Sequence, residues 1–178
     1  MTVNVKALSK SDLGLPMHIR NEFTVDSVLQ LSMKDGVIQY EAVSVPAYTK
    51  HYPDDLLPMA EYIENPDKYL VIARTDQAIV GLAAVSRNWN GLALLEELKV
   101  DTDYRRHGLG KRLIDVVKEW ARVRGMAGIM LETQHNNVLA CKFYEGYGFT
   151  IGGFDRYVYK AIEPSKDEVA LYWYLMLS

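Results

Sequence analysis

A cluster of arginines and glycines at residues 105–112 has the composition of a phosphate-binding loop. The segment is Arg-Arg-His-Gly-Leu-Gly-Lys-Arg. Glycines let an anion approach the backbone closely, and a helix that begins here adds unpaired N–H groups and the positive end of its dipole. The spacing differs from a Walker A loop, and Leu113 stands where the dinucleotide fingerprint needs a third glycine. We therefore predict a site for a pyrophosphate, with an ordinary helix-capping turn as the alternative.

Two adjacent carboxylates, Glu96 and Glu97, precede this loop. In a regular strand Glu96 shares a face with Leu94 and Leu98, while Glu97 points to the opposite face. Desolvation between leucines would make Glu96 a better proton acceptor near neutral pH. A β-bulge would change which carboxylate faces a cleft. The alternative is that one or both carboxylates are paired with Lys or Arg and serve the structure.

The elements around these residues form a strand, a loop and a helix. Residues 92–100 alternate as a strand, and a helical period takes over at Gly108. We expect this helix to end near Gly125 and a buried strand to follow at residues 127–132, which implies a parallel crossover. The apolar stripe of the helix consists of Leu109, Leu113, Val116, Val117 and Trp120.

The sequence before residue 100 favours β structure. Residues 69–100 predict a three-stranded antiparallel meander, in which Asn90-Gly91 forms a type I′ turn. A hairpin is expected around residues 33–36, although residues 23–34 could also form a helix. Pro46 should end the second strand of that hairpin. Further strands are expected at 3–8, 149–159 and 168–177, and further helices at 56–65 and 136–144.

This pattern predicts an α/β fold, a mixed twisted sheet of about six to seven strands flanked by helices. The 178 residues suit a single domain, residues 1–178. The net charge of −3 disfavours nucleic acid and weakly favours a cationic ligand. We find no signal peptide and no apolar run that could span a membrane, so we expect a cytoplasmic protein. The single cysteine, Cys141, and the scattered histidines predict no disulfide and no metal site.

Two segments together resemble the GNAT N-acetyltransferase superfamily. Arg105-x-x-Gly108-x-Gly110 is similar to its acyl-CoA loop, and residues 137–149 (NVLACKFYEGYGF) match its pattern N-x-x-A-x-x-F-Y-x-x-x-G-F. The resemblance implies acetyl-CoA as cofactor and direct transfer to an amine, so that Cys141 is not needed as a nucleophile.

The family pattern also assigns roles to individual residues. It implies residues 92–149 as the acetyl-CoA-binding core, Tyr144 as general acid, and Glu96 or Glu97 as base. Asn137 could instead be a helix N-cap, and Tyr144 a packing residue. The cofactor-binding residues implied are Leu98, Lys99, Val100, Arg105, Arg106, His107, Gly108, Leu109, Gly110, Lys111, Asn137 and Tyr144.

A closer likeness links four segments to the streptothricin acetyltransferases, a group within this superfamily. These segments are RNWN at 87–90, LEELKV at 95–100, residues 130–144 and ALYWYL at 170–175. The likeness implies acetylation of the β-lysine amine of that antibiotic, with residues 23–60 on the acceptor side. Carboxylates and aromatic rings suit such a cation, which gives as substrate-binding candidates Tyr40, Tyr48, Asp54, Asp55, Trp89 and Glu97.

His135 departs from the acidic residue that this group tends to have, which keeps other acceptors open. The alternatives are another polyamine or a protein lysine as acceptor, or a non-catalytic acyl-CoA-binding module. The apolar last strand is compatible with a monomer or a homodimer.

Overall fold

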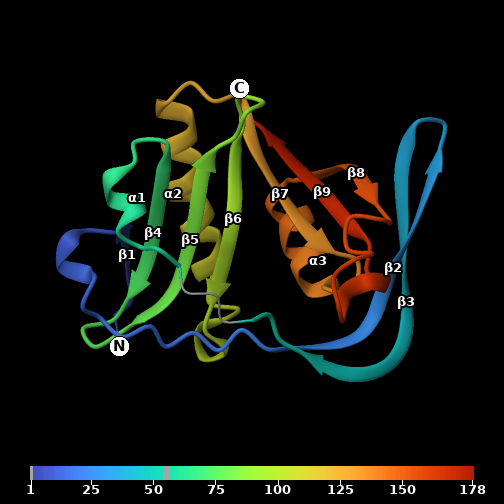
Figure 1. Cartoon of the computed structure of the whole chain (residues 1–178), viewed down its shortest axis with the longest axis horizontal. Coiled ribbons are helices and arrows are strands. Elements are labelled where there is room, and N and C mark those ends of the chain that lie inside the picture. Colours follow the sequence, from blue (N-terminus) through green and yellow to red (C-terminus); the bar gives the residue numbers. More distant parts are fainter. Residues whose placement is uncertain (1, 54–56) are drawn as a thin grey trace. The chain divides into compact units, whose positions relative to one another are not determined.

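The computed structural model describes residues 2–53 and 57–178. These fall into two compact units, each described by itself: a first unit of residues 1–22, 51–129 and 176–178, and a second unit of residues 23–50 and 130–175. Single strands or runs of consecutive strands are separated by short and long helices along the chain (Figure 1). The 3₁₀ helices are η1 (Lys10–Asp12), η2 (Thr102–Tyr104) and η3 (Ser165–Asp167).

The first unit contains an antiparallel arrangement of four strands. These are β1 (Asn4–Ala7), β4 (Lys68–Arg74), β5 (Ile79–Arg87) and β6 (Ala93–Val100), and their order in the sheet is β1-β4-β5-β6 (Figure 1). The predicted meander of residues 69–100 is therefore confirmed. α1 (Glu61–Glu64) packs on β4, and α2 (Leu109–Val123) packs on β4, β5 and β6.

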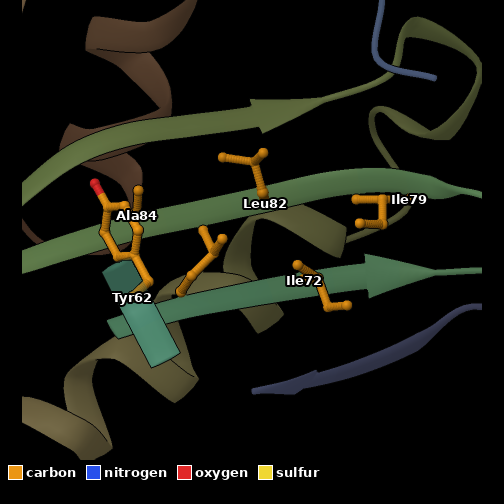
Figure 2. Packing of buried hydrophobic residues seen from close by; sticks show 6 residues of the cluster. Tyr62, Ile72, Ile79, Leu82 and Ala84 are labelled. Carbon is orange, nitrogen blue, oxygen red and sulfur yellow. The ribbon is translucent and has the colours of Figure 1, made fainter. Parts of the chain in front are cut away.

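Residues of β4 and β5 are buried on both faces of the sheet. Leu70 pairs with Ala84, and Ile72 pairs with Leu82, so that these side chains project to one face, where Tyr62 of α1 joins them (Figure 2). Because both faces are covered, the two strands are nearly continuous apolar runs rather than alternating ones.

The opposite face of the sheet contacts α2. A Cβ placed on Gly81 would lie 3.6 Å from Leu113 of the helix and 3.1 Å from the Lys99 carbonyl, so a side chain there would need its neighbours to shift. The helix buries Leu109, Leu113, Val117 and Trp120, as predicted. Ile114 and Ala121 complete its buried stripe, whereas Val116 is only half-buried.

The second unit combines three strands, one helix and a ribbon. β7 (Gly128–Gln134), which begins in the first unit, α3 (Val138–Tyr147), β8 (Thr150–Asp155) and β9 (Ala170–Met176) follow one another, and the strand order is β7-β9-β8. β2 (Phe23–Lys34) and β3 (Val37–Lys50) form the ribbon. Asp35 and Gly36, with φ of 52° and 76°, form its two-residue turn, so the predicted hairpin is confirmed and the helical alternative is wrong.

Several details of the elements differ from the prediction. Pro46 does not end its strand. It lies within β3 where the pairing with β2 is irregular, opposite Val25–Ser27, so the strand ladder requires no N–H donor at this position. The strand expected to reach residue 159 ends at Asp155, whose carboxylate accepts hydrogen bonds from the backbone N–H groups of Tyr157 and Val158. The α-helix predicted from residue 56, which lies outside the described residues, to 65 is α-helical only at Glu61–Glu64.

A further difference concerns the turn before β6. Positive φ is found at Gly91 but not at Asn90, so the pair is not a type I′ turn. Instead the Gly91 N–H donates to the Asn88 carbonyl, and the Asn88 N–H donates to the Leu92 carbonyl. The loop is therefore one residue longer than expected, with Gly91 in the left-handed position.

The predicted fold class is confirmed: a mixed α/β fold with seven sheet strands flanked by helices. Within the described part of the chain, no helix combines the length and the apolar character needed to cross a membrane.

Candidate active site

Glu96 is the extra residue of a β-bulge in β6. Ala84 of β5 pairs with Glu97, and Val85 pairs with Leu95, so Glu96 falls between two ladder positions. Leu95 is buried, whereas Glu96 is exposed. The expectation that Glu96 lies desolvated between leucines was therefore wrong, because the bulge interrupts the regular alternation of the strand and the Glu96 side chain remains exposed. The β-bulge that the sequence analysis considered as an alternative to a regular strand is therefore present.

Two hydroxyl groups hold the Glu96 carboxylate. The Tyr62 hydroxyl donates to Oε2 at 2.6 Å, and the Ser86 hydroxyl donates to Oε1 at 2.8 Å. Tyr62 is only 8% exposed. Burial raises the pKa of Tyr62 well above its ordinary value, and the hydrogen bond to Glu96 raises it further. Tyr62 therefore remains a proton donor at every physiological pH.

The sequence reasoning missed Tyr62 and Ser86. Tyr62 lies within the predicted helix at 56–65, and a tyrosine at a buried helical position needs a partner for its hydroxyl. That requirement was the available signal, but it could not name the partner 34 residues away.

Glu97 has a different environment from Glu96. Its Oε2 lies 3.0 Å from the Lys99 ammonium, and both side chains are mostly buried. The two residues are separated by one position and share a strand face. Among the described residues no group makes a hydrogen bond of good geometry to this oxygen. The contact with Lys99 is therefore an electrostatic ion pair and not a hydrogen bond. Glu97 is thus already charge-compensated within its strand.

Charged side chains stabilise the loop after β6 through hydrogen bonds to backbone groups. The buried Asp101 carboxylate accepts hydrogen bonds from the Arg20 backbone N–H at 2.9 Å and from its guanidinium at 2.8 Å and 3.0 Å. These hydrogen bonds hold the pKa of Asp101 far below its usual range. The Arg105 guanidinium donates to the carbonyls of Val100, Glu22 and Arg20. The donors of the first arginine in the predicted phosphate loop are therefore bound to backbone carbonyls at the end of β6 and in residues 20–22.

The start of α2 presents an open, positively charged surface. Arg106 and Gly108 have φ of 61° and 76°, which turns the chain sharply into the helix. A Cβ on Gly108 would meet no described atom within 4 Å. Arg106, His107 and Lys111 are exposed around this turn, and the first N–H groups of a helix lack intrahelical partners. The arrangement fits a pyrophosphate, which would contact these N–H groups and cations.

The remaining predicted cofactor residues of the first unit lie beside this loop along the chain. Leu98, Lys99 and Val100 form the last residues of β6 and are partly buried, and Leu109 and Gly110 form the first turn of α2, with Leu109 buried.

The second predicted motif forms α3 of the second unit. Asn137 caps the helix, because its side-chain oxygen accepts a hydrogen bond from the Ala140 N–H at 3.2 Å. Tyr144 is buried, and its ring meets Phe143 and Phe149 edge-on. Burial raises the pKa of the Cys141 thiol to about 11, so at neutral pH very little of the nucleophilic thiolate exists.

The predicted acceptor residues are distributed over both units. Tyr40 and Tyr48 belong to β3 of the second unit. Burial and a hydrogen bond to Glu145 raise the pKa of Tyr40 to about 12. Trp89 of the first unit lies in the turn before β6 and is 93% exposed. Asp54 and Asp55 lie outside the described residues.

A polar network at the end of β3 was not anticipated. The Lys50 ammonium donates to Glu168 at 2.5 Å, and the Asn136 amide donates to Glu168 at 3.1 Å and to the Tyr48 hydroxyl at 3.2 Å. His135 adjoins it, and its Nδ1 accepts a hydrogen bond from the Val169 N–H. Burial lowers the pKa of His135. Within residues 2–53 and 57–178, no group of three or more His, Cys, Asp or Glu residues is placed to hold a metal ion.

Known proteins resemble this chain over nearly its full length. The acetyltransferase (GNAT) family model matches residues 35–149. Streptothricin acetyltransferase A of Bacillus subtilis strain 168 is 34% identical over 176 residues, covering 98% of this chain and 98% of that protein. A streptothricin acetyltransferase of Escherichia coli is 36% identical over 154 residues, covering 86% of this chain and 85% of that protein.

A solved structure supports the same relationship. It is that of a protein from Bacillus anthracis str. Ames, assigned as a streptothricin acetyltransferase and crystallised with acetyl coenzyme A. It has a TM-score of 0.90 and 44% sequence identity, and covers 100% of this chain and 99% of that one.

Proposed function

The chain belongs to the acetyltransferase (GNAT) family, and from this premise we propose that it transfers the acetyl group of acetyl-CoA to the β-lysine amine of streptothricin and so confers resistance to that antibiotic. The observation that carries the proposal is the similarity, over nearly the whole chain, to proteins named for this activity. The acyltransferase chemistry follows from the family, whereas the choice of amine depends on these relatives.

Acetyl-CoA supplies the acetyl group as a thioester. We assign its pyrophosphate to the α2 N-terminus, where Gly108 and Gly110 leave the backbone open and Arg106, His107 and Lys111 surround it. Arg105 shapes this loop through its three carbonyl contacts. The backbone N–H groups of Leu98 and Val100 bind the pantetheine arm and polarise the acetyl carbonyl, as in the family pattern.

Glu96 acts as the base. An alkylammonium must lose a proton before its nitrogen can attack, because nearly all of it is charged at pH 7. Glu96 is exposed, and its two partners are neutral hydroxyls. It therefore keeps a full negative charge with which to orient the ammonium and accept its proton, directly or through water. Glu97, whose charge is compensated by Lys99, contacts the acceptor but does not transfer its proton.

Tyr144 and Asn137 take the roles of the second motif. Tyr144 donates a proton to the departing thiolate, and Asn137 adds a contact to the pantetheine arm. Tyr40, Tyr48 and Trp89, with Asp54 and Asp55, provide aromatic and acidic groups for a polycation, and residues 23–60 are the acceptor side of a domain that spans residues 1–178. Because acetyl-CoA is a cytoplasmic metabolite, we place the reaction in the cytoplasm.

The proposal is tested by following thiol release from acetyl-CoA with a panel of amines: streptothricin, spermidine, lysine, an aminoglycoside and a histone-tail peptide. We expect saturable turnover on streptothricin alone. Turnover only on another amine would overturn the resistance role while keeping the chemistry. Tight acetyl-CoA binding without turnover on any amine would instead support a binding module.

Two substitutions test the residue assignments. Gly108→Trp should abolish acetyl-CoA binding, measured by calorimetry, while circular dichroism shows a folded protein; unchanged affinity would remove the phosphate-loop assignment. Tyr144→Phe should lower kcat while the affinity for acetyl-CoA stays within about twofold, as expected when a proton donor is lost. An unchanged kcat would exclude Tyr144 as the acid.

A further inference from the structure

We propose that Tyr62 is a positioning residue for the reaction, and that it acts by fixing the Glu96 carboxylate. This inference rests on the proposed function, since it assumes that Glu96 is the base. Tyr62 comes from α1, a four-residue helix, and no part of either sequence motif includes it.

The position of the Tyr62 ring is determined by the core, not by the site. The ring belongs to the buried cluster with Leu70, Ile72, Leu82 and Ala84 (Figure 2). The hydroxyl alone leaves this cluster and donates to Glu96 Oε2 at 2.6 Å. A hydroxyl whose ring is held in a packed core has little freedom, so it defines where the carboxylate oxygen must lie.

The carboxylate needs such a support because of the bulge. Glu96 is the residue between the paired positions Leu95 and Glu97, and its exposed side chain is not restrained by packing. Ser86 provides the second restraint, at Oε1. With one hydroxyl on each oxygen, both the plane and the direction of the carboxylate are set, and each oxygen keeps acceptor capacity for an ammonium.

The charge around this pair also matters. Glu97 adjoins Glu96 on β6, Lys68 of β4 lies 5.3 Å from the centre of the Tyr62 ring, and Glu61 of α1 pairs with Lys68 at 2.6 Å. The Lys68 ammonium is therefore paired with Glu61 and also interacts electrostatically with Glu96, whereas the hydroxyls of Tyr62 and Ser86 that donate to Glu96 are neutral. Such donors orient a carboxylate without cancelling its charge, whereas an ammonium would do both.

The test is a double-mutant cycle of Tyr62→Phe and Glu96→Gln, measured as kcat with streptothricin at saturating acetyl-CoA. We expect Tyr62→Phe to lower kcat about 10-fold, the value of a hydrogen bond to a charged group, with the KM for acetyl-CoA unchanged. In the Glu96→Gln background the same substitution should have no effect. The acid limb of the pH–rate profile should move to higher pH in Tyr62→Phe, because a lost donor disfavours the charged carboxylate.

Tyr159→Phe is the matched control. The Tyr159 hydroxyl also donates to a carboxylate, that of Glu132 in the second unit, so its loss should leave kcat and the pH profile within about twofold. A thermal melt of each variant checks folding. If Tyr62→Phe does not fold, Ser86→Ala removes the other donor at a half-buried position and must shift the acid limb in the same direction.

The outcomes separate the two proposals. If Glu96→Gln keeps full activity, the assignment of the base fails. If Glu96→Gln is impaired but Tyr62→Phe is not, or if Tyr62→Phe is equally harmful in both backgrounds, the positioning role of Tyr62 is wrong while the base assignment stands. An unshifted acid limb in Ser86→Ala would also contradict the role of the hydroxyl donors.

Discussion

Glu96 of the first unit and Glu168 of the second unit show two ways in which a protein can hold a carboxylate. Glu96 is exposed and receives hydrogen bonds from two neutral hydroxyls, those of Tyr62 and Ser86. Glu168 has a side chain only 14% exposed and accepts a bond from the Lys50 ammonium at 2.5 Å. The first carboxylate is oriented but keeps its charge, whereas the second is neutralised. Only the first is suited to attract and deprotonate a cationic substrate.

The largest effect should come from removing the charge of Glu96. We expect Glu96→Gln to lower kcat at pH 7 about 100-fold or more, the usual contribution of a general base. Glu168→Gln is the matched substitution, and its folded fraction should retain kcat within about threefold. Steady-state kinetics normalised by active protein measure both. Equal losses in the two variants would abolish the functional distinction between the two carboxylates.

For the free energy of unfolding we expect the opposite order, with the larger effect in the network around Glu168. Lys50→Met removes the cation from a mostly buried pair and should lower the free energy of unfolding by about 3 kcal/mol, because Glu168 is left with an uncompensated charge. Urea denaturation measures this change. Lys68→Met, which breaks the more exposed pair with Glu61, should cost less than about 1 kcal/mol. A Lys50→Met protein as stable as the parent would show that this network is not structural.

Asp101 adds a third case, a buried carboxylate bound to an arginine that is more than half exposed. Asp101→Asn should lower stability at pH 7 by about 1–2 kcal/mol, discounted for the exposure of Arg20. The pKa of Asp101 is lowered on folding, so its contribution is present above about pH 4 and is lost at lower pH. Denaturation at pH 7 and at pH 3 should therefore show a smaller difference between the two proteins at pH 3. A constant difference would contradict the ion pair.

The smallest effect is expected at His135, beside the Lys50–Glu168 pair. Burial lowers the pKa of His135, so the folded state resists its protonation and stability should fall as the pH drops below about 6.5. His135→Asn retains an acceptor for the Val169 N–H. Between pH 7.5 and 5.5, the free energy of unfolding should fall less in this variant than in the parent protein, with a difference of less than about 1 kcal/mol. Unaltered pH dependence would exclude His135 as its source.

Periodicity and turn residues predicted most of the elements, because they depend on neighbouring residues. The meander at 69–100 and the turn at Asp35-Gly36 are examples. The predicted boundaries of elements were wrong where a strand distant in the sequence determined them. Pro46 stays in β3 because the pairing with β2 is irregular there, and no local signal reports the register of a partner strand.

The sequence by itself determined which chemistry the chain can perform. The loop at 105–110 and the motif at 137–149 predicted the family, and Glu96 and Glu97 were identified as the candidate bases. Only the tertiary structure decided what surrounds these groups. The bulge exposes Glu96, Tyr62 and Ser86 hold it, and Arg105 donates to the carbonyls of Val100, Glu22 and Arg20. Hydrogen bonds between residues far apart in the chain depend on tertiary packing, and the local periodicity of a sequence does not report which distant residues become partners.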